Sequence, residues 1–426
     1  MSDRYPASAL TRRRLLETAG ATAAGFAGCL GAEPEDPQLE VLHNWNSGPE
    51  QEAVTALTDG FETAHPDVDT DFRPIAIAGN KTFEWVVRNR LEQGDPPSSF
   101  ATRAGGALGR YEGYLGDEAL RDGALSEAHV DAVREHCRYD GRLVAVPLSV
   151  QRTNCLFYGV DVVEEAGVDP DALSTPTDLL DALDLVASET DATPMAHGMY
   201  EPRTTLRLIA SVLLGQSGAD AYAAFLEGDG GEEAVRRAVE TTERILSNHI
   251  QSESDSFGEF DAREELVRGR ATFLQQGDWA ADELRSEGFE YGTDWDVVPF
   301  PGTERTYAMV LDAFAYPVDE NGGNPSPSLT ETWLGYVAGR EGQRRFNARR
   351  GTTPTRVDVS TETFEPFAAR SVDAFRDAEH HVPSLARGLA VDPERVSDAE
   401  TVLREYFSGP FNAEATVQGL IDAVRT

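Results

Sequence analysis

The sequence predicts an α/β protein built from two lobes, and two observations carry this prediction. Apolar patterns with a period of two residues alternate with patterns of helical period, which is typical of a largely parallel sheet covered by helices. The 426 residues are also too many for one ordinary hydrophobic core, so two lobes are expected.

The first elements establish the alternation. Residues 39–45 alternate as a strand should, because Leu39, Val41 and His43 fall on one face. Ser47 and Glu50 then have the spacing of a capping box, which predicts that a helix begins there. The pattern continues with a strand, a helix and a strand at residues 68–77, 81–93 and 99–102.

The middle and the end of the chain continue in the same way. Asp140-Gly141 predicts a turn, and two strands follow it at residues 143–146 and 154–158. Helices are predicted at residues 176–187, 205–214, 232–247, 262–268, 331–347 and 400–407.

Three polar or aromatic residues follow directly on expected strands. Trp45 and Glu50 come after the first strand, and Arg103 comes after the third. Ligands of α/β sheets bind beyond the carboxyl ends of the strands, near helix N-termini. We therefore expect these three side chains at a ligand site.

The charge of the chain narrows the classes of partner. The formal net charge is −37, acids occur in nearly every segment, and Lys81 is the only lysine. A dispersed acidic surface with almost no lysine is typical of a protein adapted to multimolar salt, which screens the repulsion. An acidic surface for a basic partner is the alternative. Nucleic-acid binding is disfavoured, because phosphate contacts need a basic face.

The N-terminal segment has the features of an export and anchoring signal. Arg12 and Arg13 precede a short apolar run, which resembles a twin-arginine signal, and residues 26–29 resemble a lipobox that ends at Cys29. We expect a signal peptide at residues 1–28, acylation of Cys29 and a flexible tether at residues 29–38. An amphipathic helix with a chance cysteine is the alternative. Cys137 and Cys155 remain, and the sequence leaves open whether they pair.

Further segments resemble one known family. Tyr139-Asp140-Gly141-Arg142 followed by Val146-Pro147-Leu148, Asn154 and Phe157-Tyr158 resembles a signature of family 1 extracellular solute-binding proteins. Similar resemblances occur, in the family's order, at residues 175–180, 269–271, 277–279, 299–303 and 311–314, the last two resembling the glucose/mannose branch. The similarity runs from about residue 39 to the C-terminus.

This resemblance implies a two-lobed, type II periplasmic-binding-protein-like fold with a ligand cleft between the lobes. It places one lobe at residues 39–148 and about 300–350, and the other at 149–299 and about 351–426. It further implies a monomeric sugar-binding subunit of an ABC importer, anchored outside the cell, which closes on a sugar and docks on permease subunits. Neither catalysis nor a cofactor or metal is implied.

The resemblance also implies a sugar site. Sugars need flat aromatic rings for stacking, and carboxylates and amides for their hydroxyls. Residues at the matching positions are Trp45, Glu50, Gln151, Asn154, Tyr200, Asp278, Trp279 and Asp312. Plain structural roles stay open for several of them: Trp279 as a core aromatic, Asp278 and Asp312 as caps, and Glu50 as part of the capping box. Trp45 has the least reason to be a core residue.

Two arginines depart from the family pattern. Arg103 and Arg387 stand where the glucose/mannose branch has histidines, and they would face one cleft from opposite lobes. Two guanidiniums need anions, because burying them unpaired is costly. Either they pair with Asp312 or Glu50, or the ligand is an anionic sugar such as a uronic acid or a sulfated sugar.

Other functions remain as alternatives. A binding protein for a non-sugar solute and a receptor for taxis share the fold. A secreted glycoside hydrolase would need two carboxylates across one glycosidic bond, and Glu50 and Asp312 are the candidates.

Overall fold

The computed structural model describes residues 38–75, 82–117, 120, 125, 127–228, 230–408 and 411–425. These residues belong to one compact unit, Pro37–Thr426. Arg12, Arg13, Cys29 and Lys81 lie outside the described residues, so the expected signal peptide, anchor and tether stay predictions.

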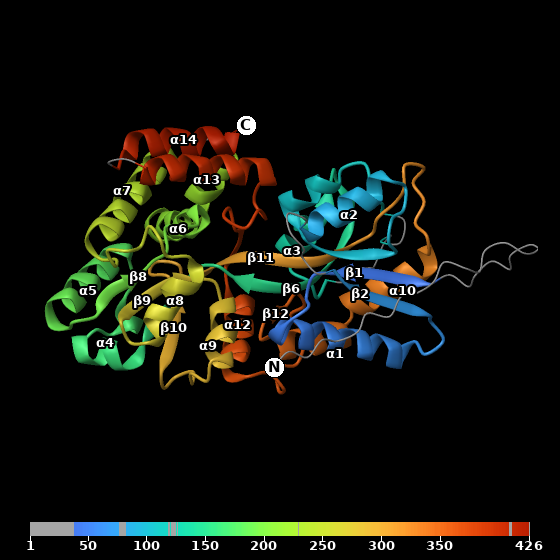
Figure 1. The fold of residues 1–426 in the computed structure, drawn as a ribbon, viewed down its shortest axis with the longest axis horizontal. Coiled ribbons are helices and arrows are strands. Elements are labelled where there is room, and N and C mark those ends of the chain that lie inside the picture. Colours follow the sequence, from blue (N-terminus) through green and yellow to red (C-terminus); the bar gives the residue numbers. More distant parts are fainter. Residues whose placement is uncertain are drawn as a thin grey trace, which may run out of the picture. The chain divides into compact units, whose positions relative to one another are not determined.

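The larger of the two main sheets has seven strands in the order β12-β6-β11-β3-β1-β2, with β13 beside β11 (Figure 1). Its strands are β1 (Leu39–His43), β2 (Thr70–Pro74), β3 (Ser99–Arg103), β6 (Ala145–Arg152), β11 (Thr306–Ala315), β12 (Thr353–Pro354) and β13 (His380–Pro383). The sheet is mixed, because β1 is parallel to β2 and β3, whereas β11 is antiparallel to β3 and β6. Parallel pairing in this sheet occurs at β1, β2 and β3 and between β11 and β13, so the expected mainly parallel sheet is found only in part. Strands β6 and β11 carry the chain to and from the second sheet, so they run in opposite directions.

Helices bury the apolar positions of this sheet. Leu57, Phe61, Trp333 and Phe346 are buried in one hydrophobic core with the strands. Helices that contribute to this core include α1 (Gly48–Ala64), α2 (Phe83–Glu92), α3 (Asp131–His136), α10 (Pro327–Ala338), α11 (Arg340–Arg350) and the 3₁₀ helix η1 (Gly105–Tyr111). The predicted turn joins β4 (Arg138–Tyr139) to β5 (Arg142–Leu143), with φ of 49° at Asp140 and 73° at Gly141.

The smaller main sheet has four strands in the order β10-β7-β9-β8. They are β7 (Cys155–Gly159), β8 (Thr193–Ala196), β9 (Ala271–Gln276) and β10 (Trp295–Pro299), and only β8 and β9 pair in parallel. The elements around it are α4 (Val160–Ala166), η3 (Pro170–Ala172), α5 (Pro176–Glu189), α6 (Pro202–Leu226), α7 (Glu232–Asn248), α8 (Glu259–Val267), α9 (Trp279–Ser286), α13 (Pro393–Phe407) and α14 (Ala413–Arg425). Helices α13 and α14 pack side by side and contact α6 and α7 (Figure 1).

The chain passes between the two sheets at short segments. Strand β6 ends at Arg152 and β7 begins at Cys155, and β10 ends at Pro299 before β11 begins at Thr306. Strands β12 and β13, which come after the crossing expected near Gly351, still pair within the larger sheet. Helix α12 (Pro366–Asp377) contributes Phe375 to the larger core and packs Phe367 on Trp295 of the smaller lobe.

The predicted two-lobed α/β class is confirmed, and two local predictions are wrong. The helix expected at residues 331–347 is two helices, α10 and α11, because Gly339 has extended backbone angles between them. The capping box is also not formed, since Ser47 makes no side-chain capping hydrogen bond and Glu50 turns toward Arg350 instead.

Candidate functional site

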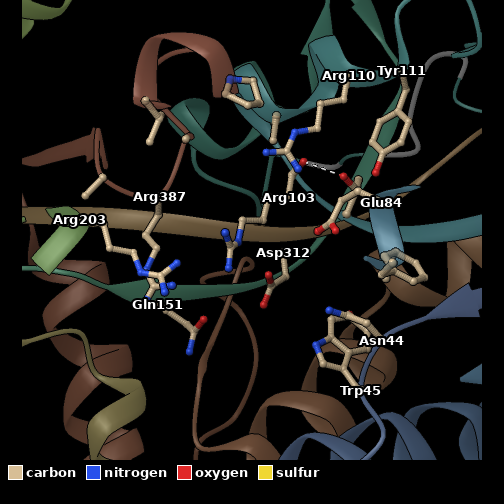
Figure 2. A pocket seen from close by; sticks show the side chains of 18 of the residues that line it. Asn44, Trp45, Glu84, Arg103, Arg110, Tyr111, Gln151, Arg203, Asp312 and Arg387 are labelled. Atoms are coloured by element: carbon tan, nitrogen blue, oxygen red, sulfur yellow. Dashed lines mark hydrogen bonds between the residues drawn. The ribbon is translucent and has the colours of Figure 1, made fainter. Parts of the chain in front are cut away.

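A cavity of about 360 Å³ lies between the larger sheet and helices of the smaller lobe (Figure 2). The ends of β1, β3 and β6 and the middle of β11 reach it from the larger sheet, and α6, α13 and the segment after β13 reach it from the smaller lobe. Its lining includes the predicted residues Trp45, Glu50, Arg103, Gln151, Asp312 and Arg387. It also includes Asn44, Phe83, Glu84, Arg110, Tyr111, Arg203, Arg350, Ser397 and Glu400.

The sheet register explains why Arg103 and Asp312 meet at the cavity. Arg103 is the last residue of β3, and Asp312 lies directly opposite it on the antiparallel strand β11. Ser149 on β6 faces Asp312 from the other side and donates a hydrogen bond to its Oδ2 at 3.2 Å. Three neighbouring strands therefore place polar side chains side by side near the cavity.

Arg350 is the last residue of α11, and its guanidinium binds two carboxylates of this wall. Its Nη1 lies 2.9 Å from Asp312 Oδ2, and its Nη2 lies 2.7 Å from Glu50 Oε1. Burial lowers the pKa of Arg350, but Asp312 and Glu50 outweigh burial and raise it. Neither Arg103 nor Arg387 pairs with these two acids, so the pairing considered from the sequence is replaced by one with Arg350.

Trp45 is both a core residue and part of the cavity wall. Its ring contacts Phe346 and Phe314 at centroid distances of 5.2 and 5.8 Å, and only 5% of the residue is exposed. The guanidinium of Arg350 lies 5.6 Å from the ring centroid. The expectation that Trp45 has little reason to be a core residue is wrong, because its ring fills the space between β11 and α11.

Arg387 enters the cavity from the smaller lobe. Its guanidinium lies 4.2 Å from the centroid of the Trp279 ring and donates to both oxygens of Glu259, at 3.3 and 3.4 Å. Arg207 binds the same carboxylate more closely, at 2.6 Å. Burial would raise the pKa of Glu259, but the two arginines hold it at about 2. Trp279 does not line the cavity, so it acts as a platform for Arg387.

Gln151 and Arg103 are polar side chains at the cavity without a hydrogen-bond or ion-pair partner within the described part of the chain. Gln151 is 7% exposed, and its amide makes no hydrogen bond with any described residue. Arg103 forms no ion pair with a described carboxylate, although it is adjacent to Asp312 in the sheet. Figure 2 shows both side chains directed into the cavity.

Besides Trp279, three further predicted residues do not line the cavity. Asn154 is fully buried at the passage between the sheets, where its side chain bonds Arg152, Thr303 and the backbone of Thr306 and Ala308. The hydrogen bonds of the Asn154 amide link β6, β7 and β11 to one another. The sequence-based assignment of Asn154 to the ligand site is therefore wrong.

Tyr200 and Asp278 lie elsewhere for different reasons. Tyr200 is 73% exposed in the turn before α6 and takes no part in the cavity wall. Asp278 is buried at the start of α9, where its Oδ2 accepts the backbone N–H of Arg152 at 2.7 Å. Burial raises its pKa to about 8, and its Oδ1 has no hydrogen-bond partner.

The remaining sequence features have no role at the cavity. Cys137 and Cys155 are buried free thiols in separate hydrophobic cores, and burial raises the pKa of Cys155 to about 12. No cluster of three metal-ligating side chains occurs among the described residues. In the same part of the chain, no helix combines the length and the apolar character that crossing a bilayer requires.

A family model described as bacterial extracellular solute-binding protein matches residues 90–371. The chain belongs to this family. It is 37% identical over 406 residues to the xylose/arabinose-binding protein XacG of Haloferax volcanii, covering 93% of this chain and 86% of that protein. A probable sugar-binding periplasmic protein of Rhizobium meliloti is 27% identical over 405 residues, covering 91% and 93% of the two chains.

Solved structures show that this solute-binding protein has the fold of its family. A structure from a study of xylan utilization by Caldanaerobius polysaccharolyticus superposes with a TM-score of 0.74 at 16% identity, covering 90% of this chain and 99% of the other. A chitin oligosaccharide binding protein superposes with a TM-score of 0.73, also at 16% identity, covering 91% and 98%. The two-lobed binding-protein fold expected from the sequence is thereby confirmed.

Proposed function

We propose that this extracellular solute-binding protein captures a sugar in the cavity between its lobes and delivers it to the permease of an ABC importer. The observation that carries the proposal is the composition of the wall. An indole ring, carboxylates and an unpartnered amide are the groups that bind the apolar faces and the hydroxyls of a sugar. The printed names of the relatives from Haloferax volcanii and Rhizobium meliloti support a sugar ligand.

The proposal assigns the two lobes from the two hydrophobic cores. Residues 39–148 and about 300–350 supply most of the larger core, and residues 149–299 supply much of the smaller lobe. We place the last crossing after Pro383, because β12 and β13 still pair in the larger sheet and Leu385 packs in the smaller core. Sugar bound between the lobes would stabilise a closed form that the permease recognises.

The sugar of this proposal has a pentose or hexose ring. The glucose/mannose resemblance favours a hexose, whereas the name of the Haloferax volcanii relative favours xylose or arabinose. A glycoside hydrolase has less support, because one guanidinium bridges Glu50 and Asp312 on the same wall instead of leaving them on two sides of a bond.

The proposal includes how the protein reaches and stays at its site of action. Arg12 and Arg13 would direct twin-arginine export, and acylated Cys29 would anchor a monomer at the outer face of the membrane. The acidic composition would keep this surface hydrated in multimolar salt.

Calorimetric titration of the purified protein in multimolar KCl tests this function. We expect one site for at least one of xylose, arabinose, glucose and mannose, and no cleavage of the matching oligosaccharides by chromatography. Catalytic turnover of an oligosaccharide, or no heat with any sugar, would contradict the proposal.

A further inference from the structure

Positive charge is in excess on the side of the cavity formed by the smaller lobe. Arg203 and Arg387 line the cavity there, and Arg207 lies just behind them against Trp279. The acids that these arginines contact are Glu259, bound by Arg207 and Arg387, and Glu201, bound by Arg203. Three guanidiniums therefore share two carboxylates.

Arg103 adds a fourth positive charge from the larger sheet. Burial, more than any other cause, lowers the pKa of Arg387 to about 9, Glu259 opposes this shift, and Arg103, Arg207 and Arg203 add to it. The positive charge of Arg103 therefore contributes to lowering the pKa of Arg387 across the cavity. Figure 2 shows the side chains of Arg103, Arg203 and Arg387 directed toward the same part of the cavity.

The other carboxylates of the wall bind other arginines or lie away from Arg203. Asp312 and Glu50 bind Arg350, and Glu400 binds Arg404 on its own helix, at 3.2 Å. Glu84 lies near Arg110 and Tyr111 on the side of the view away from Arg203 (Figure 2). Of the four carboxylates of the described wall, only Glu84 forms no ion pair with a described residue.

Hydrogen-bond donors in this part of the cavity also lack acceptors. The buried Nε of Arg203 has no hydrogen-bond partner, which is costly for a buried donor. The amide of Gln151 lies at the cavity wall without a hydrogen-bond partner among the described residues, so it is available to a ligand.

We infer that Arg103, Arg203, Arg387 and Gln151 form a subsite for an anionic substituent on the sugar, so that the preferred ligand is an acidic sugar. This inference rests on the proposed function and specifies its ligand. Guanidiniums bind the planar carboxylate of a hexuronate, or the oxygens of a sulfate ester, with two parallel hydrogen bonds. The acidic group would lie toward the smaller lobe, and the sugar ring would lie toward Trp45 and Asp312.

The test compares neutral and acidic sugars that share the ring configuration of glucose. Glucuronate, glucose 6-sulfate, glucose and xylose are titrated into the wild-type protein in multimolar KCl. We expect glucuronate or glucose 6-sulfate to bind at least tenfold more tightly than glucose, and the tighter of the two identifies the acidic group.

Variants locate the subsite. Arg103→Gln, which breaks no ion pair with a described residue, should weaken binding of the acidic sugar by about 10- to 100-fold, the range of one charge-assisted hydrogen bond. It should change binding of glucose by less than about threefold. Arg88→Gln removes the same charge from an exposed arginine outside the cavity, and it should leave both affinities unaltered.

The outcomes separate this inference from the proposed function. Binding of xylose or glucose as tight as that of both acidic sugars overturns the subsite and leaves sugar capture standing. An equal loss in Arg103→Gln and Arg88→Gln also overturns it, because the effect is then a general one of charge. No binding of any sugar overturns both.

Discussion

Replacing Arg350 with alanine tests how the larger lobe holds its acids at the cavity. Arg350 and Asp312 are 7% and 12% exposed at their side chains, so the change leaves a buried carboxylate without its counterion, which costs about 3–5 kcal/mol. Glu50 is 46% exposed, so its bond to Arg350 contributes no more than about 1 kcal/mol. We expect Arg350→Ala to lower the free energy of unfolding by about 4 kcal/mol, and Glu50→Gln by less than about 1 kcal/mol.

Scanning calorimetry in multimolar KCl measures the effect. With an unfolding entropy of about 2.1 cal/mol/K per residue over a chain of 426 residues, a loss of about 4 kcal/mol lowers the Tm by about 4 °C. The double variant Arg350→Met with Asp312→Leu removes both charges, and it should recover at least half of the loss. A decrease below about 1 °C for Arg350→Ala, or an equal decrease for Glu50→Gln, would refute the reasoning.

Four further predictions follow from the sequence and the structure. The Tm should fall as KCl is lowered below about 1 M, because carboxylate repulsion is then less screened; an unchanged Tm in a salt series would contradict the adaptation to salt. Cys29→Ser should release the protein from membrane fractions, and mass spectrometry of the native protein should find an acylated Cys29 at its N-terminus; an intact Met1 in those fractions would exclude the anchor. Burial raises the pKa of Asp278 to about 8, so the folded state holds a proton that the unfolded state loses near pH 4. The free energy of unfolding should therefore fall as the pH rises from about 4 to 8. Urea titrations at several pH values should show this slope in the wild-type protein and a flatter one in Asp278→Asn. A Cβ at Gly277 would lie 2.0 Å from the Trp279 ring, so Gly277→Ala should displace the platform of Arg387 and cost about 1–3 kcal/mol; an unchanged Tm and unchanged sugar affinity would refute this packing role.

Amphipathic helices could be predicted from the sequence, but two strands that are buried on both faces could not. The helix expected at residues 232–247 is α7 (Glu232–Asn248), because one apolar face follows the helical period. Strand β9 was missed because every residue from Ala271 to Gln276 is buried, so the segment has no alternation. Strand β11 was missed for the same reason, since nine of its ten residues are buried.

The rule for strand ends in α/β sheets predicted part of the site. The other residues of the site are brought together by tertiary packing. Trp45 and Arg103 follow β1 and β3, so the rule for α/β sheets places them at the cavity. The position of Arg350 at the site was not predicted, because an arginine before a glycine at a helix end ordinarily serves only to stabilise the helix C-terminus. Its contact with Glu50 depends on the packing of α11 on α1, and no local pattern encodes that packing. The burial of Asn154 likewise depends on three strands that meet only in the fold.

The crystal structure of the full-length protein with a bound sugar tests the central claim most directly. The account predicts one sugar in the cavity between the lobes, in contact with Trp45, Gln151 and Asp312, and with Arg103 and Arg387 on its acidic group when it has one. Asn154, Tyr200 and Asp278 should make no contact with it. A sugar bound outside this cavity, for example in the aromatic pocket formed by Tyr291, Trp295 and Phe367, would contradict the account.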